Sequence, residues 1–195
     1  MKIDHASAVR PYKGLQSCGD AAVHVAHGKA HRFVIIDALG HGPDAEKTAK
    51  KLSALVRETV DLQLPEVFAR CDAELTGTQL RGAAMGALEV KASESWFTGV
   101  GNIDVYGPRG ARRPVCIPGT LGRQVRKLRL QPVDLTPGTR WFMVSDGLRV
   151  RDLPKAMEST SALAPREAAA QVLDAAARPD DDASIWVLDF TEGGA

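Results

Sequence analysis

The chain has 195 residues, a length that fits one domain over 1–195 and provides enough side chains for a sizeable core. Its 25 lysines and arginines nearly balance its 24 aspartates and glutamates, so nothing in the charge points to a polyanion-binding surface. A short basic cluster at 123–129 is not interleaved with aromatic side chains that could stack on bases. We therefore expect no nucleic-acid partner.

The cysteine pattern and the N-terminus bear on location. Cys18, Cys71 and Cys116 are scattered and form no Cys-x-x-Cys pair, so neither a zinc knuckle nor a disulfide framework is expected. Met1–His5 lacks the apolar core of a signal peptide, and no stretch approaches the ~20 apolar residues of a membrane span. We expect reduced thiols, a cytoplasmic location and no membrane contact.

Two of the first predicted strands bring two acids together. Phe33–Ile36 is an apolar run rich in β-branched side chains, typical of a strand buried on both faces, and it ends at Asp37. Ala21–Ala26 alternates weakly, as a strand does, and follows Asp20. A hairpin connection joins these strands, and the start of one antiparallel strand lies beside the end of the next. Asp20 and Asp37 should therefore meet at one edge, although either acid taken alone could instead shape a turn.

Three helices and further strands complete the predicted elements. Apolar residues at three- and four-residue spacing predict a helix over 44–61, Pro65 suits the first turn of a second helix over 66–75, and an alanine-rich segment predicts a third over 165–177. The other predicted strands cover 3–9, 83–90, 95–98, 103–106, 113–117, 127–130, 140–145 and 183–190. Two blocks of strands around a helical pair, with a terminal helix, predict an α+β layered sandwich.

More acids occupy comparable positions later in the chain. The apolar strand Trp141–Val144 runs into Asp146, and Asp180–Asp182 directly precedes the last strand. Asp-Gly is also a common hairpin turn, and an acidic triplet can be a solvated loop. Crowded carboxylates, however, repel one another unless a divalent cation neutralises them, and all-oxygen ligands suit Mg²⁺ or Mn²⁺. Two such ions can activate a shared water and clamp a phosphoryl group, so we predict a phosphatase site centred on Asp37.

An ordered series of short motifs runs along nearly the whole chain. The motifs are Cys-Gly-Asp at 18–20, Val-Ile-Ile-Asp-Ala-Leu-Gly-His-Gly at 34–42, Arg-Gly-Ala-Ala-Met at 81–85, Gly-Val-Gly-Asn at 99–102, Val-Ser-Asp-Gly-Leu at 144–148 and Asp-Asp-Ala-Ser at 181–184. This series resembles that of the metal-dependent type 2C protein phosphatases, and in particular their SpoIIE/RsbX branch. The resemblance implies a four-layer αββα sandwich of two mainly antiparallel sheets flanked by helices.

The resemblance also implies a role for each acid. By motif, Asp37 would bridge two metal ions. Asp20 and the backbone carbonyl of Ala38 would hold one of the ions. Asp146 and Asp181 would hold the other.

Some positions leave alternatives open. Asp182 is the fallback for Asp181 as a metal ligand. Ala38 stands where the family usually has Gly, which would restrict the backbone if this position needs a positive φ. The arginine that eukaryotic relatives place a few residues before the first acid is missing, and Gln16 occupies that region. His41 could protonate the leaving serine oxygen, or it could have a structural role at the start of the first helix.

These features predict a phosphatase that hydrolyses phosphoserine or phosphothreonine on a protein, using two Mn²⁺ or Mg²⁺ ions and an activated water without a phosphoenzyme. The resemblance implies a substrate in a bacterial stress or sigma-factor pathway, such as an STAS-domain stressosome protein or an anti-sigma antagonist. One alternative is a non-catalytic binding module of the same fold, which Ala38 and the missing arginine favour. Another is a metal-dependent phosphoesterase for small molecules.

Overall fold

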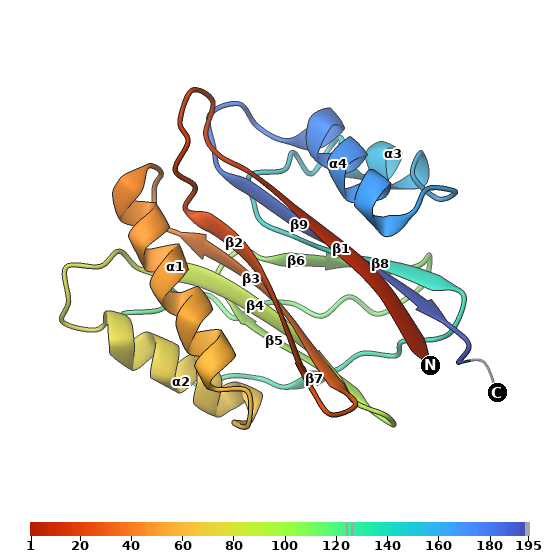
Figure 1. Cartoon of the computed structure of the whole chain (residues 1–195), viewed down its shortest axis with the longest axis horizontal. Coiled ribbons are helices and arrows are strands. Elements are labelled where there is room, and N and C mark those ends of the chain that lie inside the picture. Colours follow the sequence, from red (N-terminus) through yellow and green to blue (C-terminus); the bar gives the residue numbers. More distant parts are fainter. Residues whose placement is uncertain (124, 126, 194–195) are drawn as a thin grey trace.

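Two antiparallel β-sheets pack face to face at the centre of the computed structural model, which describes residues 1–123, 125 and 127–193 (Figure 1). One sheet has four strands in the order β1-β9-β8-β6, and the other has five in the order β2-β3-β4-β5-β7. The strands are β1 (Lys2–Arg10), β2 (Asp20–His27), β3 (Ala30–Ala38), β4 (Ala83–Val90), β5 (Ser95–Val100), β6 (Asp104–Tyr106), β7 (Gln131–Pro132), β8 (Thr139–Val144) and β9 (Ala183–Thr191).

Helices cover the outer face of each sheet. Helices α1 (Pro43–Glu58) and α2 (Leu64–Leu75) lie on the five-stranded sheet, whereas α3 (Leu153–Glu158) and α4 (Pro165–Ala176) lie on the four-stranded one (Figure 1). A separate apolar cluster fills each of the three interfaces between layers. The predicted αββα sandwich is therefore confirmed. None of the helices in the described part of the chain is long and apolar enough to cross a membrane.

Strand β3 is buried on both faces, as its apolar run predicts. Val34 and Ile36 pack toward α1 and α2, while Phe33 and Ile35 pack into the layer between the sheets. This alternation follows from the two-residue period of a strand. The Trp186 indole N–H on β9 donates to the Val34 carbonyl at 3.0 Å, so a buried hydrogen bond also joins the two sheets.

The β2–β3 hairpin confirms the predicted meeting of the first two acids. Gly28 in its turn has a φ of 60°, a conformation that glycine adopts without steric cost. From this turn the antiparallel register runs to the opposite end of the hairpin, where Asp20 faces Asp37.

Other predictions about elements are wrong. Residues 113–117 form no strand and contribute only one bridge, from Ile117 to Val100, because Pro114 in this segment has no N–H to donate. The described residues of 127–130 form no strand either; Arg126 of the basic cluster lies outside the described residues. Helix α3 was not predicted, since six residues are too few to show a helical period. The first helix ends at Glu58, short of residue 61.

Candidate metal centre

Four of the predicted ligands lie at one end of the two sheets. Asp20 begins β2 and faces Asp37 near the end of β3. Asp146 lies two residues after the end of β8, and Asp181 lies two residues before the start of β9. Because β8 and β9 are antiparallel neighbours, the end of one lies beside the start of the other. Each sheet therefore contributes two of the four acids.

The carboxyl groups are close enough for the charge of one to shift the pKa of another. Burial raises the pKa of Asp37 far above the usual carboxyl range, and the charges of Asp20, Asp146 and Asp181 raise it further. Burial also raises the pKa of Asp20, with the charges of Asp182 and Asp181 acting in the same direction. Like charges held together in a poorly solvated site disfavour ionisation. A bound cation would reverse this balance, since it stabilises the ionised form of each ligand.

One buried carboxylate oxygen at this site lacks a hydrogen-bond partner within the described part of the chain. Asp20 is 5% exposed, and its Oδ2 has no hydrogen-bond partner among the residues that the structure describes. An unpaired polar atom of this kind costs free energy that a ligand can recover. The carboxylates of these acids are hard oxygen donors, which suit Mg²⁺ and Mn²⁺. The residues present therefore fit a divalent ion of this type.

The spacing of the acids argues against one ion held by all of them. Within the described residues, no three of these acids bring one oxygen each to within 4.8 Å of one another. A single ion gathers its ligand atoms more closely than this. Two ions a few ångströms apart, with waters among their ligands, require a wider set of acids.

The structure distinguishes the two neighbouring acids at 181 and 182. Asp182 is buried, and its two oxygens accept hydrogen bonds from the backbone N–H groups of Tyr12 and Gly19, each at 2.8 Å. These bonds hold the segment between β1 and β2 against the start of β9. Asp181 is only partly buried, and its Oδ1 accepts from the Asp182 backbone N–H at 3.0 Å. Asp182 thus has a structural role, and Asp181 has more capacity left for a metal.

Asn102 is a polar neighbour of the centre that has no role in the sequence-based prediction. Its Nδ2 donates to Oδ2 of Asp146 at 2.6 Å. The Gly-Val-Gly-Asn motif at 99–102 was the only feature of the sequence that drew attention to Asn102. Its hydrogen bond could not be predicted, because it joins residues 44 positions apart and depends on how two loops meet. Groups that orient metal ligands in this way tune the affinity of the site.

Ala38 raises no backbone conflict in this structure. It lies in β3, pairs with Ala83 and donates its N–H to the Gly19 carbonyl at 3.0 Å, so its backbone is extended. The positive φ values of the following loop fall at Gly40 (77°) and Gly42 (84°) instead. The absence of glycine at position 38 therefore introduces no strain.

His41 lies at the exposed rim of the loop between β3 and α1. Its ring packs on Tyr12 with ring centroids 4.4 Å apart and planes tilted by 31°. The guanidinium of Arg81 holds the same loop by donating to the Leu39 carbonyl at 3.1 Å. This packing gives His41 a structural contact, while its exposure leaves the ring accessible to a substrate.

Comparison with known proteins finds relatives by structure only. No protein-family model and no curated protein matches the sequence. A structure from work on the bacterial stressosome as a modular system controlling secondary messenger signaling is 26% identical, with a TM-score of 0.87, covering 96% of this chain and 100% of the other. RsbX in complex with magnesium is 20% identical, with a TM-score of 0.82 and coverage of 95% and 94%. The catalytic domain of the serine/threonine phosphatase PstP with two manganese ions is 17% identical, with a TM-score of 0.72 and coverage of 98% and 100%.

These neighbours define the class of the protein. The chain has the fold of the metal-dependent type 2C protein phosphatases, and the resemblance predicted from its motifs is confirmed. RsbX is one of the solved structures that share this fold.

Proposed function

We propose that this protein is a metal-dependent serine/threonine protein phosphatase. The observation that carries the proposal is the convergence of four acids from two sheets, in which the charges of Asp20, Asp146 and Asp181 all raise the pKa of Asp37. Proteins of the same fold bind magnesium in one case and two manganese ions in another. A site made of carboxylates at a strand edge has the chemistry for the same ions here.

The resemblance to the type 2C phosphatases assigns a role to each of these residues. Asp37, whose pKa responds to all three other acids, is the bridging ligand. Asp20 and the Ala38 carbonyl hold one Mg²⁺ or Mn²⁺, and Asp146 and Asp181 hold the other. When bound, the ions supply an activated water and neutralise the charge of the phosphoryl group. The carboxylates keep these ions in place.

His41 is the proposed proton donor in this reaction. Its ring is exposed on the loop that follows Asp37, and Tyr12 packs on one side of it. From this position it would give a proton to the serine or threonine oxygen that leaves the phosphorus. If its role is only to pack on Tyr12, replacing it with Gln should alter stability without changing the pH profile of the reaction.

The proposed substrate is phosphoserine or phosphothreonine on a bacterial regulatory protein, in the cytoplasm. Support for a stressosome or anti-sigma partner with an STAS domain comes from two structural neighbours. One comes from work on the stressosome, and another contains the RsbU and RsbW domains of Rv1364c from Mycobacterium tuberculosis.

The direct test measures phosphate release from a phosphorylated STAS-domain protein with Mn²⁺, with EDTA, and with Asp37→Asn. Asp174→Asn is a matched control, since this acid is exposed on α4 and is not one of the proposed ligands. We expect release by the wild type and by the control variant in Mn²⁺, and loss of release in the other two cases. Equal rates in all four samples would end the enzyme proposal.

The second candidate is a binding module that kept the fold without catalysis, favoured by the missing arginine near Gln16. Calorimetric titration with Mn²⁺ tests whether the metal centre that a phosphatase needs is present. A scaffold that has lost the metal centre should show no uptake that depends on Asp37, whereas a phosphatase should bind two ions. Faster turnover of nucleotides or sugar phosphates than of phosphoproteins would instead support a small-molecule phosphoesterase.

A further inference from the structure

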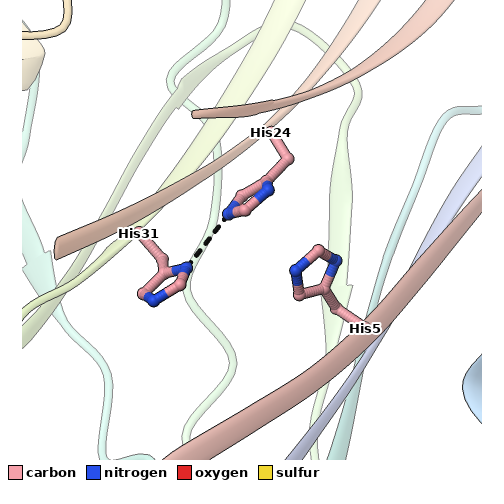
Figure 2. A group of neighbouring side chains, drawn as sticks. All are labelled: His5, His24 and His31. Carbon is pink, nitrogen blue, oxygen red and sulfur yellow. Dashed lines mark hydrogen bonds between the residues drawn. The ribbon is translucent and has the colours of Figure 1, made fainter. Parts of the chain in front are cut away.

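Three histidines from three different strands meet at the open edge between the two sheets. His5 lies on β1, His24 on β2 and His31 on β3, and Figure 2 shows their rings turned toward one another. One ring nitrogen of each lies within 4.8 Å of the others. Among the described residues, this is the one group of three His, Cys, Asp or Glu side chains with such spacing.

The register of the strands explains why these rings meet. His24 faces Phe33 and His31 faces Ala26 across the β2–β3 hairpin, so the two histidines are diagonal neighbours on the same face, within reach of each other's long side chains. That face is the one that packs between the sheets, because Phe33 belongs to the cluster that fills this layer. β1 is the edge strand of the opposite sheet and brings His5 to them.

The distances between the rings match those of a metal site. Nε2 of His24 and Nδ1 of His31 are 3.0 Å apart (Figure 2). Two imidazole nitrogens that share a tetrahedral zinc ion, each about 2.0–2.1 Å from it, are separated by about 3.3 Å. To share an ion in place of the present hydrogen bond, the rings of His24 and His31 would turn until both nitrogens point at it, and the His5 ring, which has a nitrogen within 4.8 Å of theirs, would supply a third ligand.

Aromatic side chains pack around the rings, and burial favours the neutral form of His5 and His24. His24 stacks on Phe33 with centroids 4.8 Å apart and planes 13° apart, and the Trp186 ring meets His5 edge-on at 5.7 Å. Burial lowers the pKa of His24 to about 4 and also lowers that of His5, and the neighbouring histidines lower both further. A neutral imidazole has a free nitrogen lone pair, which a metal ion requires.

We propose that His5, His24 and His31 bind one transition-metal cation of the zinc type. The ligand set is entirely nitrogen, which suits Zn²⁺, Co²⁺, Ni²⁺ or Cu²⁺ and not the Mg²⁺ or Mn²⁺ expected at the acids. A cavity of about 560 Å³ lies beside His31, and Lys2, Lys29 and Lys91 also line it.

The histidine site is separate from the acid centre. His24 lies four residues along β2 from Asp20, which is about 13 Å at the usual rise of about 3.3 Å per residue. The two sites occupy different ends of the β2–β3 hairpin and differ in ligand type. An ion held by the histidines would connect β1 of one sheet to β2 and β3 of the other, and would therefore stabilise the open edge of the sandwich.

The test uses the whole chain in excess Mg²⁺, so that the acids are occupied by an ion that imidazoles bind poorly. Co²⁺ is then titrated and its visible absorption recorded, and Zn²⁺ is added to displace it. His24→Gln and His31→Gln remove ligands, whereas His27→Gln is the matched control, an exposed histidine of the same strand that pairs with Asp61.

We expect the wild type and His27→Gln to bind one Co²⁺ with the intense bands of a four-coordinate site, and Zn²⁺ to raise the Tm of both. His24→Gln and His31→Gln should lose both effects while keeping a folded circular dichroism spectrum. His5→Gln, at an edge strand, provides a third variant should either of these fail to fold. Absence of four-coordinate Co²⁺ in the wild type, or its persistence in folded His24→Gln and His31→Gln, would overturn the proposal and leave the histidines as an aromatic cluster only.

Discussion

At the scale of single residues, the proposed metal centre combines proposed ligands with groups that position them. Asp182 uses both oxygens to hold backbone N–H groups, whereas Asp146 receives one bond, from Asn102. The first arrangement fixes the loops, and the second orients a proposed ligand. Substitutions at the two kinds of residue should therefore have different effects.

Asn102→Ala tests the orienting role. Losing the 2.6 Å bond to Asp146 should weaken the binding of one Mn²⁺ by about 10- to 100-fold, the range found when partners of metal ligands are removed. Because Asn102 is exposed, the free energy of unfolding should change by less than about 0.5 kcal/mol. Calorimetric titration with Mn²⁺ and urea denaturation in EDTA measure the two quantities. Unchanged affinity at both ion sites would contradict the role.

The raised carboxyl pKa values predict how the metal-free protein responds to pH. Asp20 and Asp37 have higher pKa values in the folded state than the usual ~4 of an unfolded chain. The folded state thus holds their protons more tightly, so this contribution to stability is complete below pH ~4 and is lost as the pH rises through the folded pKa values. In EDTA, Tm should fall from mildly acidic to neutral pH.

Asp20→Asn isolates this effect. The variant removes one buried charge and the repulsion between Asp20 and Asp37, so its Tm in EDTA should exceed that of the wild type at neutral pH and depend less on pH. Asp174→Asn should keep the wild-type slope. Parallel slopes for Asp20→Asn and the wild type would show that the two carboxyl groups do not set the pH response.

At the scale of elements, one arginine on each sheet donates hydrogen bonds to the segment that joins the two helices covering that sheet. Arg32 on β3 pairs with its cross-strand neighbour Glu89 and donates to the carbonyls of Thr59 and Leu62, between α1 and α2. On the other sheet, an equivalent arrangement joins β8 and β9 to the segment between α3 and α4. Its members are Arg140, Asp189 and the carbonyls of Thr160 and Leu163.

Removing these arginines should cost different amounts of stability. The side chains of Arg32 and Glu89 are 6% and 8% exposed, whereas those of Arg140 and Asp189 are 16% and 23% exposed. Arg32→Met removes the bonds to Glu89, Thr59 and Leu62, leaves the buried Glu89 paired with Lys91, and should lower the free energy of unfolding by about 3 kcal/mol. Arg140→Met, in a better solvated pair, should cost about half as much. Urea denaturation measures both, with exposed Arg70→Met as the control, and a larger cost at Arg140 would refute the ranking.

At the scale of the whole molecule, local patterns and long-range pairings differ in how well the sequence predicts them. The apolar run of β3 and the hairpin chemistry before it were enough to predict that Asp20 faces Asp37. The bond between Asn102 and Asp146 and the meeting of three histidines depend on contacts between loops or sheets, which no local period encodes. His5, His24 and His31 lie on three different strands, so their spacing along the chain does not show that they meet.

The same long-range geometry makes the acid centre a link between the sheets. Asp20 and Asp37 belong to the five-stranded sheet, while Asp146 and Asp181 adjoin β8 and β9 of the other. An ion bound by ligands from both sheets stabilises only the folded state in which all of those ligands are in place. Binding should therefore suppress local unfolding of the strand ends in both sheets. Amide hydrogen exchange should therefore slow on adding Mg²⁺ at the adjoining ends of β2, β3, β8 and β9 together.

Asp146→Asn provides the decisive comparison for this link. In this variant the Asp20 side of the centre keeps its carboxylates, so Mg²⁺ should still slow exchange at the ends of β2 and β3. Mg²⁺ should no longer slow amide exchange at the ends of β8 and β9, because the variant lacks the Asp146 carboxylate on that side of the centre. Asp37→Asn, which removes the proposed bridging ligand, should lose protection on both sheets. If Mg²⁺ protects β8 and β9 equally in the wild type and in Asp146→Asn, the ions are not held across the two sheets.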